Sequence, residues 1–194
     1  MTSVSYYDQN ANDFFAATVG ADMADTQGRF LSYLPLQGHI LDAGCGSGRD
    51  AACFLQSGYM VTAFDASKEM VVRATSHSGL PVLHMAFEEI AWTAEFDGIW
   101  ACASLLHVPE VGLPSIMNKL AKSLRPNGIL YGSFKYGEGE VERDGRRFTN
   151  QTEASLANLM KGIPSLLPVG MWISHDVRPG RADQWLNFLY RRSV

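Results

Sequence analysis

Three glycines at alternate positions are the residues best suited to bring a ligand against bare backbone. Gly44, Gly46 and Gly48 follow the apolar run 39–43 and precede a helical segment. A glycine turn between a strand and a helix lies in the usual ligand crevice of an open α/β sheet. Arg49 replaces the third glycine of the GxGxxG dinucleotide pattern, and no Gly-Lys-Ser/Thr follows. The turn therefore predicts a ligand that need not be a phosphate.

Two carboxylates accompany this turn. Asp65 ends the next apolar run, 21 residues after Gly44, which is about the spacing at which an acid reaches the two hydroxyls of a ribose in nucleoside-binding α/β folds. The alternative is that Asp65 only caps the following helix. Combined with the glycine turn, the spacing favours nucleoside binding. Asp42 is either a turn residue or a carboxylate that fixes the glycine loop and faces the positive end of the ligand.

A histidine and a basic loop are the remaining candidates for chemistry. His107 follows the fourth apolar run and titrates near neutral pH, so it is the best-placed general base. The alternative is a packed structural histidine among Leu105, Leu106 and Val108. Arg146 and Arg147, with Phe148 after them, would overhang the ligand crevice and grip an anionic substrate. Their alternative is a solvated loop balanced by neighbouring acids.

Short apolar runs alternate with amphipathic ones, which predicts right-handed βαβ units and a mostly parallel sheet covered on both faces. Ser67 is the expected N-cap of the helix over 68–77, and the helix containing Ile116, Leu120 and Leu124 is expected to end at 126–128. Trp100 and Trp185 lie in apolar runs and are interpreted as core. The predicted strands cover residues 39–43, 60–65, 81–87, 96–103 and 129–136.

The last third of the chain departs from this rhythm. Residues 137–150 are polar and turn-rich, and Thr152 is the expected cap of a helix over 152–161. Two further strands are predicted over 171–177 and 185–190. Only six residues with a Pro-Gly pair join them, too few for a crossover helix. They should therefore be antiparallel neighbours that close the sheet.

Composition limits the function classes. A chain of 194 residues, 46% hydrophobic and 19% charged, is expected to fold as one domain. Its three cysteines form no CxxC pair, which argues against a zinc cluster or a disulfide framework, so no metal is expected. No apolar run approaches the roughly 18 residues of a membrane span. We expect a soluble, cytoplasmic protein.

Charge is uneven along the chain, although the net charge is only −4. Residues 1–96 hold 4 basic and 11 acidic groups, whereas 97–194 hold 12 and 9. We interpret this difference as ordinary surface scatter. No block of five or six like charges occurs, so a nucleic-acid partner is not expected.

With these residues in place, the sequence resembles the class I S-adenosylmethionine-dependent methyltransferases, and more closely the small bacterial type 11 or tellurite-resistance-like members. The resemblance covers nearly the whole chain and is carried by three motifs in order, at 40–50, 61–67 and 96–108. It implies a Rossmann-like, doubly wound sheet of seven strands, mostly parallel, whose antiparallel C-terminal hairpin inserts its last strand beside the fifth. It also implies methyl transfer from S-adenosylmethionine to a small-molecule acceptor (EC 2.1.1.-), leaving S-adenosylhomocysteine.

The resemblance implies cofactor contacts for several kinds of residue. The glycine loop would line the methionine part, Asp65 would bind the ribose with Ala66 beside the adenine, and Arg29 or Arg49 would meet the carboxylate. Related sequences often carry an acid at the position of Ala86, so here the adenine contact would come from backbone near Phe87 or from Glu88. The cofactor set is Tyr7, Arg29, Asp42, Gly44, Cys45, Gly46, Gly48, Arg49, Asp65, Ala66, Phe87, Glu88, Ala101 and Cys102.

The resemblance also divides the chain into an N-terminal helical lid, residues 1–35, and a core, residues 36–194. Tyr7 belongs to the lid that closes over the cofactor. The acceptor pocket is expected to be shaped by Tyr6, Phe14, Arg147 and Phe148, with His107 as candidate base. A monomer or weak homodimer is expected. Two alternatives stay open: a non-catalytic S-adenosylmethionine-binding sensor or partner subunit, and a nicotinamide-dependent oxidoreductase.

Overall fold

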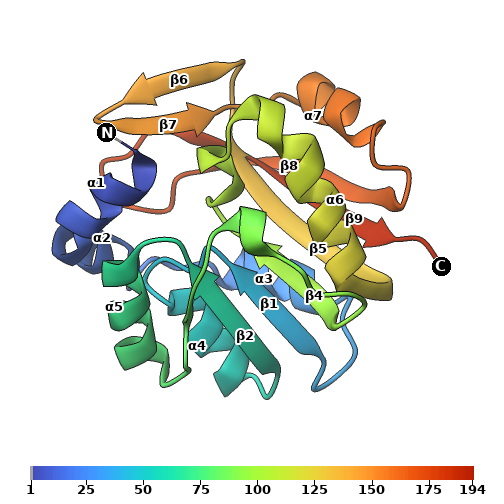
Figure 1. Cartoon of the computed structure of the whole chain (residues 1–194), viewed down its shortest axis with the longest axis horizontal. Helices are drawn as coiled ribbons and strands as arrows, with labels where there is room; N and C mark the ends of the chain where they lie inside the picture. Colours follow the sequence, from blue (N-terminus) through green and yellow to red (C-terminus); the bar gives the residue numbers. More distant parts are fainter. Residues whose placement is uncertain (1) are drawn as a thin grey trace.

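A seven-stranded sheet forms the centre of the computed structural model, which describes residues 2–194 (Figure 1). Its strand order is β3-β2-β1-β4-β5-β9-β8. The first five strands in this order are parallel, β9 runs antiparallel to them, and β8 pairs antiparallel with β9. The predicted fold class is confirmed, with the last strand beside the fifth. The strands are β1 His39–Ala43, β2 Met60–Asp65, β3 Leu83–His84, β4 Phe96–Ala101, β5 Leu124–Lys135, β8 Leu166–His175 and β9 Gln184–Arg192.

Helices cover both faces of this sheet. Three short helices precede β1, α4 and α5 follow β1 and β2, and α6 and α7 lie on the opposite face (Figure 1). The α-helices are α1 Ser3–Gln9, α2 Ala11–Thr18, α3 Ala24–Leu31, α4 Arg49–Gln56, α5 Lys68–Ser78, α6 Leu113–Ser123 and α7 Glu153–Met160. Single 3-10 turns are η1 Phe87–Glu89, η2 Leu105–His107 and η3 Glu110–Gly112.

Alternation along the strands explains the two layers. Successive side chains of a strand point to opposite faces. Leu41 and Ile99 belong to the core cluster under α6 and α7, whereas Ile40 and Trp100 belong to the cluster that contains Phe30 of α3. All five are fully buried. Because both faces of the sheet are buried, neighbouring positions of β1 and β4 are apolar on both faces, as is typical of parallel strands.

Two predicted boundaries were wrong. The third strand is only β3, Leu83–His84, and the chain turns into η1 at Phe87. Helix α6 ends at Ser123 rather than at 126–128, and Leu124 already begins β5. Asn127 has a φ of 66° in an irregular stretch of that strand. The Pro-Asn-Gly sequence therefore marks an irregularity in β5 and not the end of a helix.

The polar stretch 137–150 is more ordered than its composition predicted. It contains an antiparallel hairpin made of β6, Glu140–Arg143, and β7, Arg146–Thr149. Asp144 and Gly145 have φ values of 53° and 72°, which suits an Asp-Gly turn of type I′. The hairpin lies against α1, where the hydroxyl of Ser3 accepts the N–H of Arg147 at 3.1 Å (Figure 1). It thus meets the N-terminal helices although it is far from them in sequence.

The expected caps and the C-terminal hairpin are confirmed. Ser67 accepts the N–H of Met70 at 3.2 Å, and Thr152 accepts the N–H of Ser155 at 3.3 Å. Strand β9 pairs antiparallel with both β5 and β8. Strands β8 and β9 are each longer than predicted, because pairing continues beyond the apolar runs to Leu166 and Arg192.

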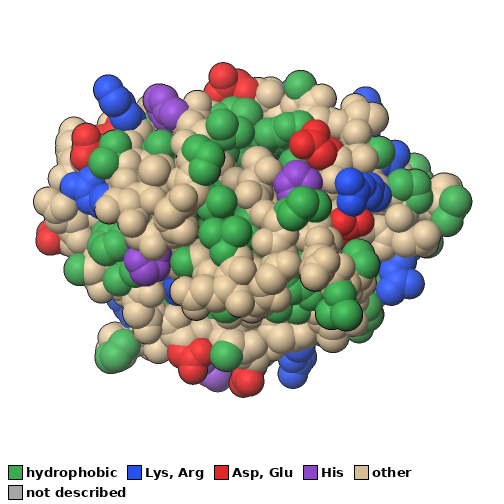
Figure 2. Space-filling view, turned by 90° about the horizontal axis from the view of Figure 1, so that it is seen from below, with side chains coloured by type: hydrophobic (Ala, Val, Ile, Leu, Met, Phe, Trp, Pro, Cys, Tyr) green, Lys and Arg blue, Asp and Glu red, His purple; other side chains and the backbone are tan. Residues whose placement is uncertain are grey.

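Within residues 2–194, no helix combines the length and apolar character needed to cross a membrane. On the face in Figure 2, basic and acidic side chains are scattered among apolar ones, and no continuous basic band crosses that face.

Candidate functional site

A large cavity opens at the carboxyl ends of β1, β2, β4 and β5, beneath α1, α2 and the β6–β7 hairpin. Its volume is about 1230 Å³. Small-molecule sites usually enclose about 300–1000 Å³. The cavity thus has room for a cofactor and a second small molecule together. Its position is the crevice that the sequence predicted from the glycine turn.

The glycine loop forms one wall, and each glycine is needed for a different reason. Gly44 has a φ of 75°, and an added Cβ would come within 2.5 Å of the Cβ of Ser104. Gly46 has a φ of 53° and faces Phe14 of α2. At Gly48 a Cβ would meet Ala74 of α5 at 3.0 Å. Gly44 and Gly46 therefore line the cavity, whereas Gly48 allows α4 to pack closely on α5.

Asp65 is held by the backbone around it. Its Oδ2 accepts the N–H of Gly46 at 2.9 Å, and its Oδ1 accepts the N–H of Ser67 at 2.9 Å. Burial raises the pKa of Asp65, and these two backbone bonds oppose that rise. The carboxylate lines the cavity with lone pairs left over. It can accept hydrogen bonds from two hydroxyl groups of a ligand while it keeps its bonds to the N–H groups of Gly46 and Ser67.

Asp42 is a buried carboxylate with one unused oxygen. It is 2% exposed, and its Oδ2 has no hydrogen-bond partner among residues 2–194. Burial, reinforced by the charge of Asp50, raises its pKa well above the ordinary value. An orphaned buried carboxylate oxygen is costly unless a ligand supplies a partner. Its place in the cavity wall makes a cationic group the fitting partner.

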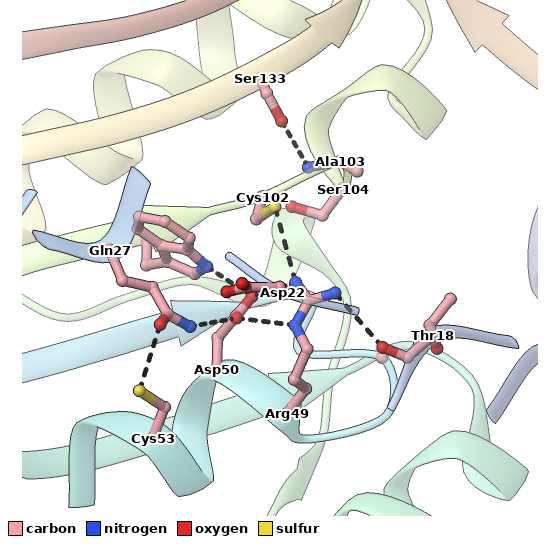
Figure 3. Close-up of polar contacts among 12 residues, drawn as sticks. Thr18, Asp22, Gln27, Arg49, Asp50, Cys53, Cys102, Ala103, Ser104 and Ser133 are labelled. Carbon is pink, nitrogen blue, oxygen red and sulfur yellow. Dashed lines mark hydrogen bonds and ion pairs between the residues drawn. The ribbon is translucent and has the colours of Figure 1, made fainter. Parts of the chain in front are cut away.

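Beside it, Asp50 is the centre of a polar cluster that the sequence analysis missed (Figure 3). Its Oδ1 accepts from Gln27 at 2.7 Å, and its Oδ2 accepts from the indole of Trp100 at 2.8 Å. Arg49 donates to both oxygens, at 2.9 and 2.7 Å. Burial lowers the pKa of Arg49, but Asp50 more than offsets this and raises it. The cluster fixes the Arg49 guanidinium in the cavity wall, below the carbonyl of Thr18.

Tyr7 of α1 reaches across the cavity to His107. Its hydroxyl lies 2.7 Å from Nε2 of His107, and Nδ1 of the same ring lies 2.8 Å from the carbonyl oxygen of Arg147. A carbonyl only accepts, so Nδ1 carries the proton and Nε2 accepts from Tyr7. Burial lowers the pKa of His107 to about 4 and raises that of Tyr7 to about 12. The predicted base is therefore neutral, and its free nitrogen is already occupied.

The hairpin separates the two arginines that the sequence analysis treated alike. Arg146 lies over the rings of Tyr6, at 4.2 Å, and Phe148, at 5.1 Å. Arg147 is half-exposed, and its Nε lies 3.2 Å from a carboxylate oxygen of Glu140. Phe148 is 5% exposed and packs on His107. The guanidinium held within the aromatic wall is that of Arg146, which the sequence predicted together with Arg147 as a residue able to grip an anionic substrate.

Most predicted site residues meet at the cavity. Tyr7, Phe14, Arg29, Asp42, Gly44, Cys45, Gly46, Arg49, Asp65, Ala66, Phe87, Glu88, Cys102, His107, Arg147 and Phe148 line it. Gly48, Ala101 and Tyr6 are not among the lining residues. Ala101 is fully buried in β4, one residue before the cavity begins at Cys102, and Tyr6 lies under the Arg146 guanidinium. No group of three metal-ligating side chains is placed to hold a metal ion anywhere in residues 2–194.

Comparison with known proteins supports the predicted resemblance. A family model described as a methyltransferase domain matches residues 40–128, which contain all three predicted motifs. The resemblance to the class I S-adenosylmethionine-dependent methyltransferases is confirmed. The matched stretch runs from β1 to β5, whereas the β6–β7 hairpin and the last two strands lie outside it.

Relatives known from their sequences are similar to this chain as well. The ubiquinone biosynthesis O-methyltransferase of Xylella fastidiosa is 30% identical over 165 residues, which are 79% of this chain and 61% of that protein. The chain thus spans about three fifths of the length of the curated relatives that it matches.

Two crystal structures share the fold. The Burkholderia thailandensis 1,6-didemethyltoxoflavin-N1-methyltransferase, with bound 1,6-didemethyltoxoflavin and S-adenosylhomocysteine, has a TM-score of 0.77 at 23% identity, covering 98% of this chain and 85% of its own. The magnesium protoporphyrin IX methyltransferase of Synechocystis PCC 6803, with bound S-adenosylmethionine, has a TM-score of 0.71 at 18% identity, covering 98% and 95%.

The residues that line this cavity fit S-adenosylmethionine, the cofactor that the resemblance implies. S-adenosylmethionine carries an ammonium group, a sulfonium, a ribose and an adenine. The orphaned Oδ2 of Asp42 suits a cation, Asp65 suits the ribose hydroxyls, and the Arg49 guanidinium suits a carboxylate. Near the adenine end, the N–H of Ala86 is already donated to Glu89 at 2.8 Å. Adenine contacts from this segment are therefore left to Phe87 and Glu88, which both line the cavity.

Proposed function

We propose that this chain transfers a methyl group from S-adenosylmethionine to a small-molecule acceptor by in-line displacement, as an enzyme of class EC 2.1.1.-. The observation that carries the proposal is the joint arrangement of the Gly44–Gly46 loop, the braced carboxylate of Asp65 and the unpartnered oxygen of Asp42. These groups suit a ligand that combines a nucleoside with a cation. The resemblance names that ligand as the cofactor.

The cofactor supplies an electrophilic methyl group on a positively charged sulfur. In the transfer, a lone pair of the acceptor forms a bond to the methyl carbon, and the electron pair of the carbon–sulfur bond returns to sulfur. The residues of this chain have to align the reactants and exclude water, and such positioning contributes up to about 7–11 kcal/mol. Helices α1 and α2, which close over the cavity, perform the exclusion.

A base is needed only when the acceptor atom is protonated. His107 is the proposed base, yet its Nε2 accepts the hydroxyl of Tyr7. A proton from the acceptor would therefore reach His107 through the Tyr7 hydroxyl, or directly after α1 moves away. The low pKa of His107, about 4, makes it a weak base. This arrangement favours an acceptor that needs little help in losing a proton.

We further propose that residues 1–35 act as a helical lid on the core formed by residues 36–194. Supporting contacts run from α1 to distant elements: Asp8 accepts from the hydroxyl of Ser67 at 2.7 Å, and Tyr7 donates to His107. Free Cys45, Cys53 and Cys102 support a reducing, cytoplasmic location. We also propose that the protein is bacterial and that it is a monomer or a weak homodimer.

Calorimetry with S-adenosylhomocysteine tests the cofactor part. We expect the wild-type protein to bind it and Asp65→Ala to weaken binding by about 1–3 kcal/mol, because the ribose hydroxyls lose their acceptor. Glu138→Ala, an exposed acid outside the cavity lining, is the matched control and should bind like wild type. Well-folded protein that shows no binding at millimolar ligand would overturn the proposal.

Product formation separates the enzyme from the two alternatives. Labelled S-adenosylmethionine incubated with thiols, halides, tellurite and carboxylates should yield a methylated product in at least one case. A sensor would bind the cofactor and transfer nothing. A nicotinamide-dependent oxidoreductase would instead show a raised melting temperature with reduced nicotinamide cofactor.

A further inference from the structure

Two buried side-chain atoms among residues 2–194 have no hydrogen-bond partner: Oδ2 of Asp42 and Nε of Arg146. Both residues line the same cavity. Asp42 comes from β1, at the foot of the glycine loop, and Arg146 comes from β7, in the hairpin. One orphan is an acceptor and the other a donor. The first is accounted for by the cofactor's positive end, but the proposed cofactor binding does not use the second.

The charges of the cavity wall are divided in the same way. Up to Glu88 the lining holds six acids and two arginines, which suits a cationic cofactor. From Lys135 onward it holds six basic residues and four acids. The basic residues of this second part are Lys135, Arg143, Arg146, Arg147, Arg178 and Arg181.

Half of these six basic side chains have a carboxylate partner at close range. Lys135 lies 3.0 Å from Asp183, Arg178 lies 2.5 Å from Asp176, and Arg147 lies 3.2 Å from Glu140. Arg146 has no such partner although its side chain is only 18% exposed, because its carboxylate neighbour Asp144 lies 3.7 Å away and is 67% exposed. That distance is too long for a hydrogen bond. Arg146 therefore keeps donor capacity that the chain does not use.

Aromatic rings surround this guanidinium. Its Cζ lies 4.2 Å from the ring centre of Tyr6, 5.1 Å from Phe148 and 6.0 Å from Tyr7. Such stacking holds an arginine in place but satisfies none of its N–H groups. The buried Nε–H requires an acceptor. A planar oxyanion is the partner that matches the N–H geometry of a guanidinium best.

Building on the proposed function, we propose that Arg146 anchors an oxyanion of the methyl acceptor, and that the acceptor is a small aromatic acid. The aromatic part follows from Tyr7, His107 and Phe148, which form the wall around the anchor. The acidic part follows from the unpartnered Nε–H of Arg146. A carboxylate and a phosphate monoester share this chemistry, and the test separates them.

Calorimetry on the full chain, with and without S-adenosylhomocysteine, measures the preference for acids. The probes are benzoate against benzamide, indole-3-acetate against indole-3-acetamide, and phenyl phosphate. We expect at least one acid to bind about tenfold or more tightly than its neutral counterpart. Phenyl phosphate binding more tightly than both carboxylates would assign the oxyanion to a phosphate, and the reverse order would assign it to a carboxylate.

Variants locate the preference. Arg146→Gln should lower the affinity for the acid about 10- to 100-fold and leave the amide unchanged, and Arg146→Lys should lose less. Lys161→Gln removes one positive charge from an exposed site outside the cavity lining and should bind like wild type.

Acids and amides that bind equally, the absence of any acid binding, or an Arg146→Gln variant that keeps the preference would each overturn the inference. S-adenosylhomocysteine affinity is measured on the same samples. If the cofactor product binds and the acids do not, the inference fails while the proposed function stands. If the cofactor product does not bind, the proposed function itself fails. Unchanged cofactor affinity in Arg146→Gln also shows that this variant folds.

Discussion

Asp42 is a buried carboxyl group whose Oδ2 has no hydrogen-bond partner among residues 2–194. Its pKa is raised by burial and by the nearby charge of Asp50. The folded protein therefore holds a proton on Asp42 at pH values where the unfolded chain, with an ordinary value of 3.8, has released it. Between pH 3.8 and the raised pKa of the folded protein, the free energy of unfolding that the protonated carboxyl contributes is lost as pH rises. Binding a cation there removes this penalty, so folding and cofactor affinity oppose each other at this residue.

Asp42→Asn should change folding stability and cofactor affinity in opposite directions. The amide does not ionise, so the ligand-free variant should keep its stability as pH rises through the raised pKa, whereas wild type loses some. Affinity for S-adenosylmethionine should fall by about 1.5–3 kcal/mol, because a charged hydrogen bond is lost. Urea unfolding at several pH values and calorimetry at pH 7 measure the two effects. Equal pH dependence in both proteins would contradict the assignment.

At the scale of elements, the glycine loop combines an unusual backbone conformation with a tight neighbour. Gly44 and Gly58 share a positive φ, of 75° and 85°. Only Gly44 also faces a close side chain, because Ser104 holds its position by donating to the carbonyl of Ala43 at 2.6 Å. The loop after β1 and the segment after β4 are therefore fitted to each other.

A matched pair of variants separates strain from collision. Gly58→Ala should cost about 1–2 kcal/mol, the strain of a left-handed alanine, because nothing lies within 4 Å of its Cβ. Gly44→Ala should cost more, since its Cβ would also collide with Ser104. Urea unfolding measures both. Similar losses at the two positions would show that Ser104 moves aside.

Helix α1 is held to the core by few bonds, and Tyr7 makes one of them. Tyr7→Phe removes the hydrogen bond to His107, worth about 0.5–1.5 kcal/mol. We expect S-adenosylhomocysteine to dissociate about two- to tenfold faster, as the lid opens more often. Stopped-flow displacement measures the rate. Tyr33→Phe, at an exposed tyrosine outside the cavity lining, is the control. An unchanged rate in Tyr7→Phe would mean that α1 does not gate the site.

At the scale of the whole molecule, the Asp50 cluster joins three elements. Gln27 comes from α3 and Asp50 from α4 (Figure 3), and Trp100 comes from β4 in the middle of the sheet. Arg49, which lines the cavity, depends on the same carboxylate. Global stability and the shape of the cofactor site are thus coupled through one buried side chain.

Trp100→Phe should weaken both properties. It leaves one oxygen of Asp50 short of a donor and opens a small cavity, which together cost about 2–4 kcal/mol. S-adenosylhomocysteine affinity should fall as well, because Arg49 loses its fixed partner. Trp92→Phe, in the half-buried tryptophan that packs on Phe96, is the control and should lose less. Urea unfolding measures the loss of stability, and calorimetry measures the loss of affinity. Equal losses in Trp100→Phe and Trp92→Phe would show that the indole N–H of Trp100 has no special role.

The sequence predicted the sheet and the position of the cavity, because they depend on local patterns. Apolar runs, caps and the glycine turn are each contained in a few consecutive residues. The Asp50 cluster was not predictable in this way, since its donors come from residues 23 and 50 positions away. Trp185, interpreted as core, packs against the core and also lines the cavity. The uneven distribution of charge along the chain was interpreted as surface scatter. In the fold, the acidic first part and the more basic second part of the chain also form two differently charged parts of one cavity wall.

The hairpin has a consequence for how specificity is encoded. Within β7 the side chains of Arg146 and Arg147 point to opposite sides, and the Asp144-Gly145 turn alone decides which of them faces inward. Inserting or deleting one residue in that turn would exchange the two arginines without altering either. With Arg146 in its proposed role, the number of residues in the turn helps to determine which acceptor binds. Sequence comparisons that score only residue identity would overlook this.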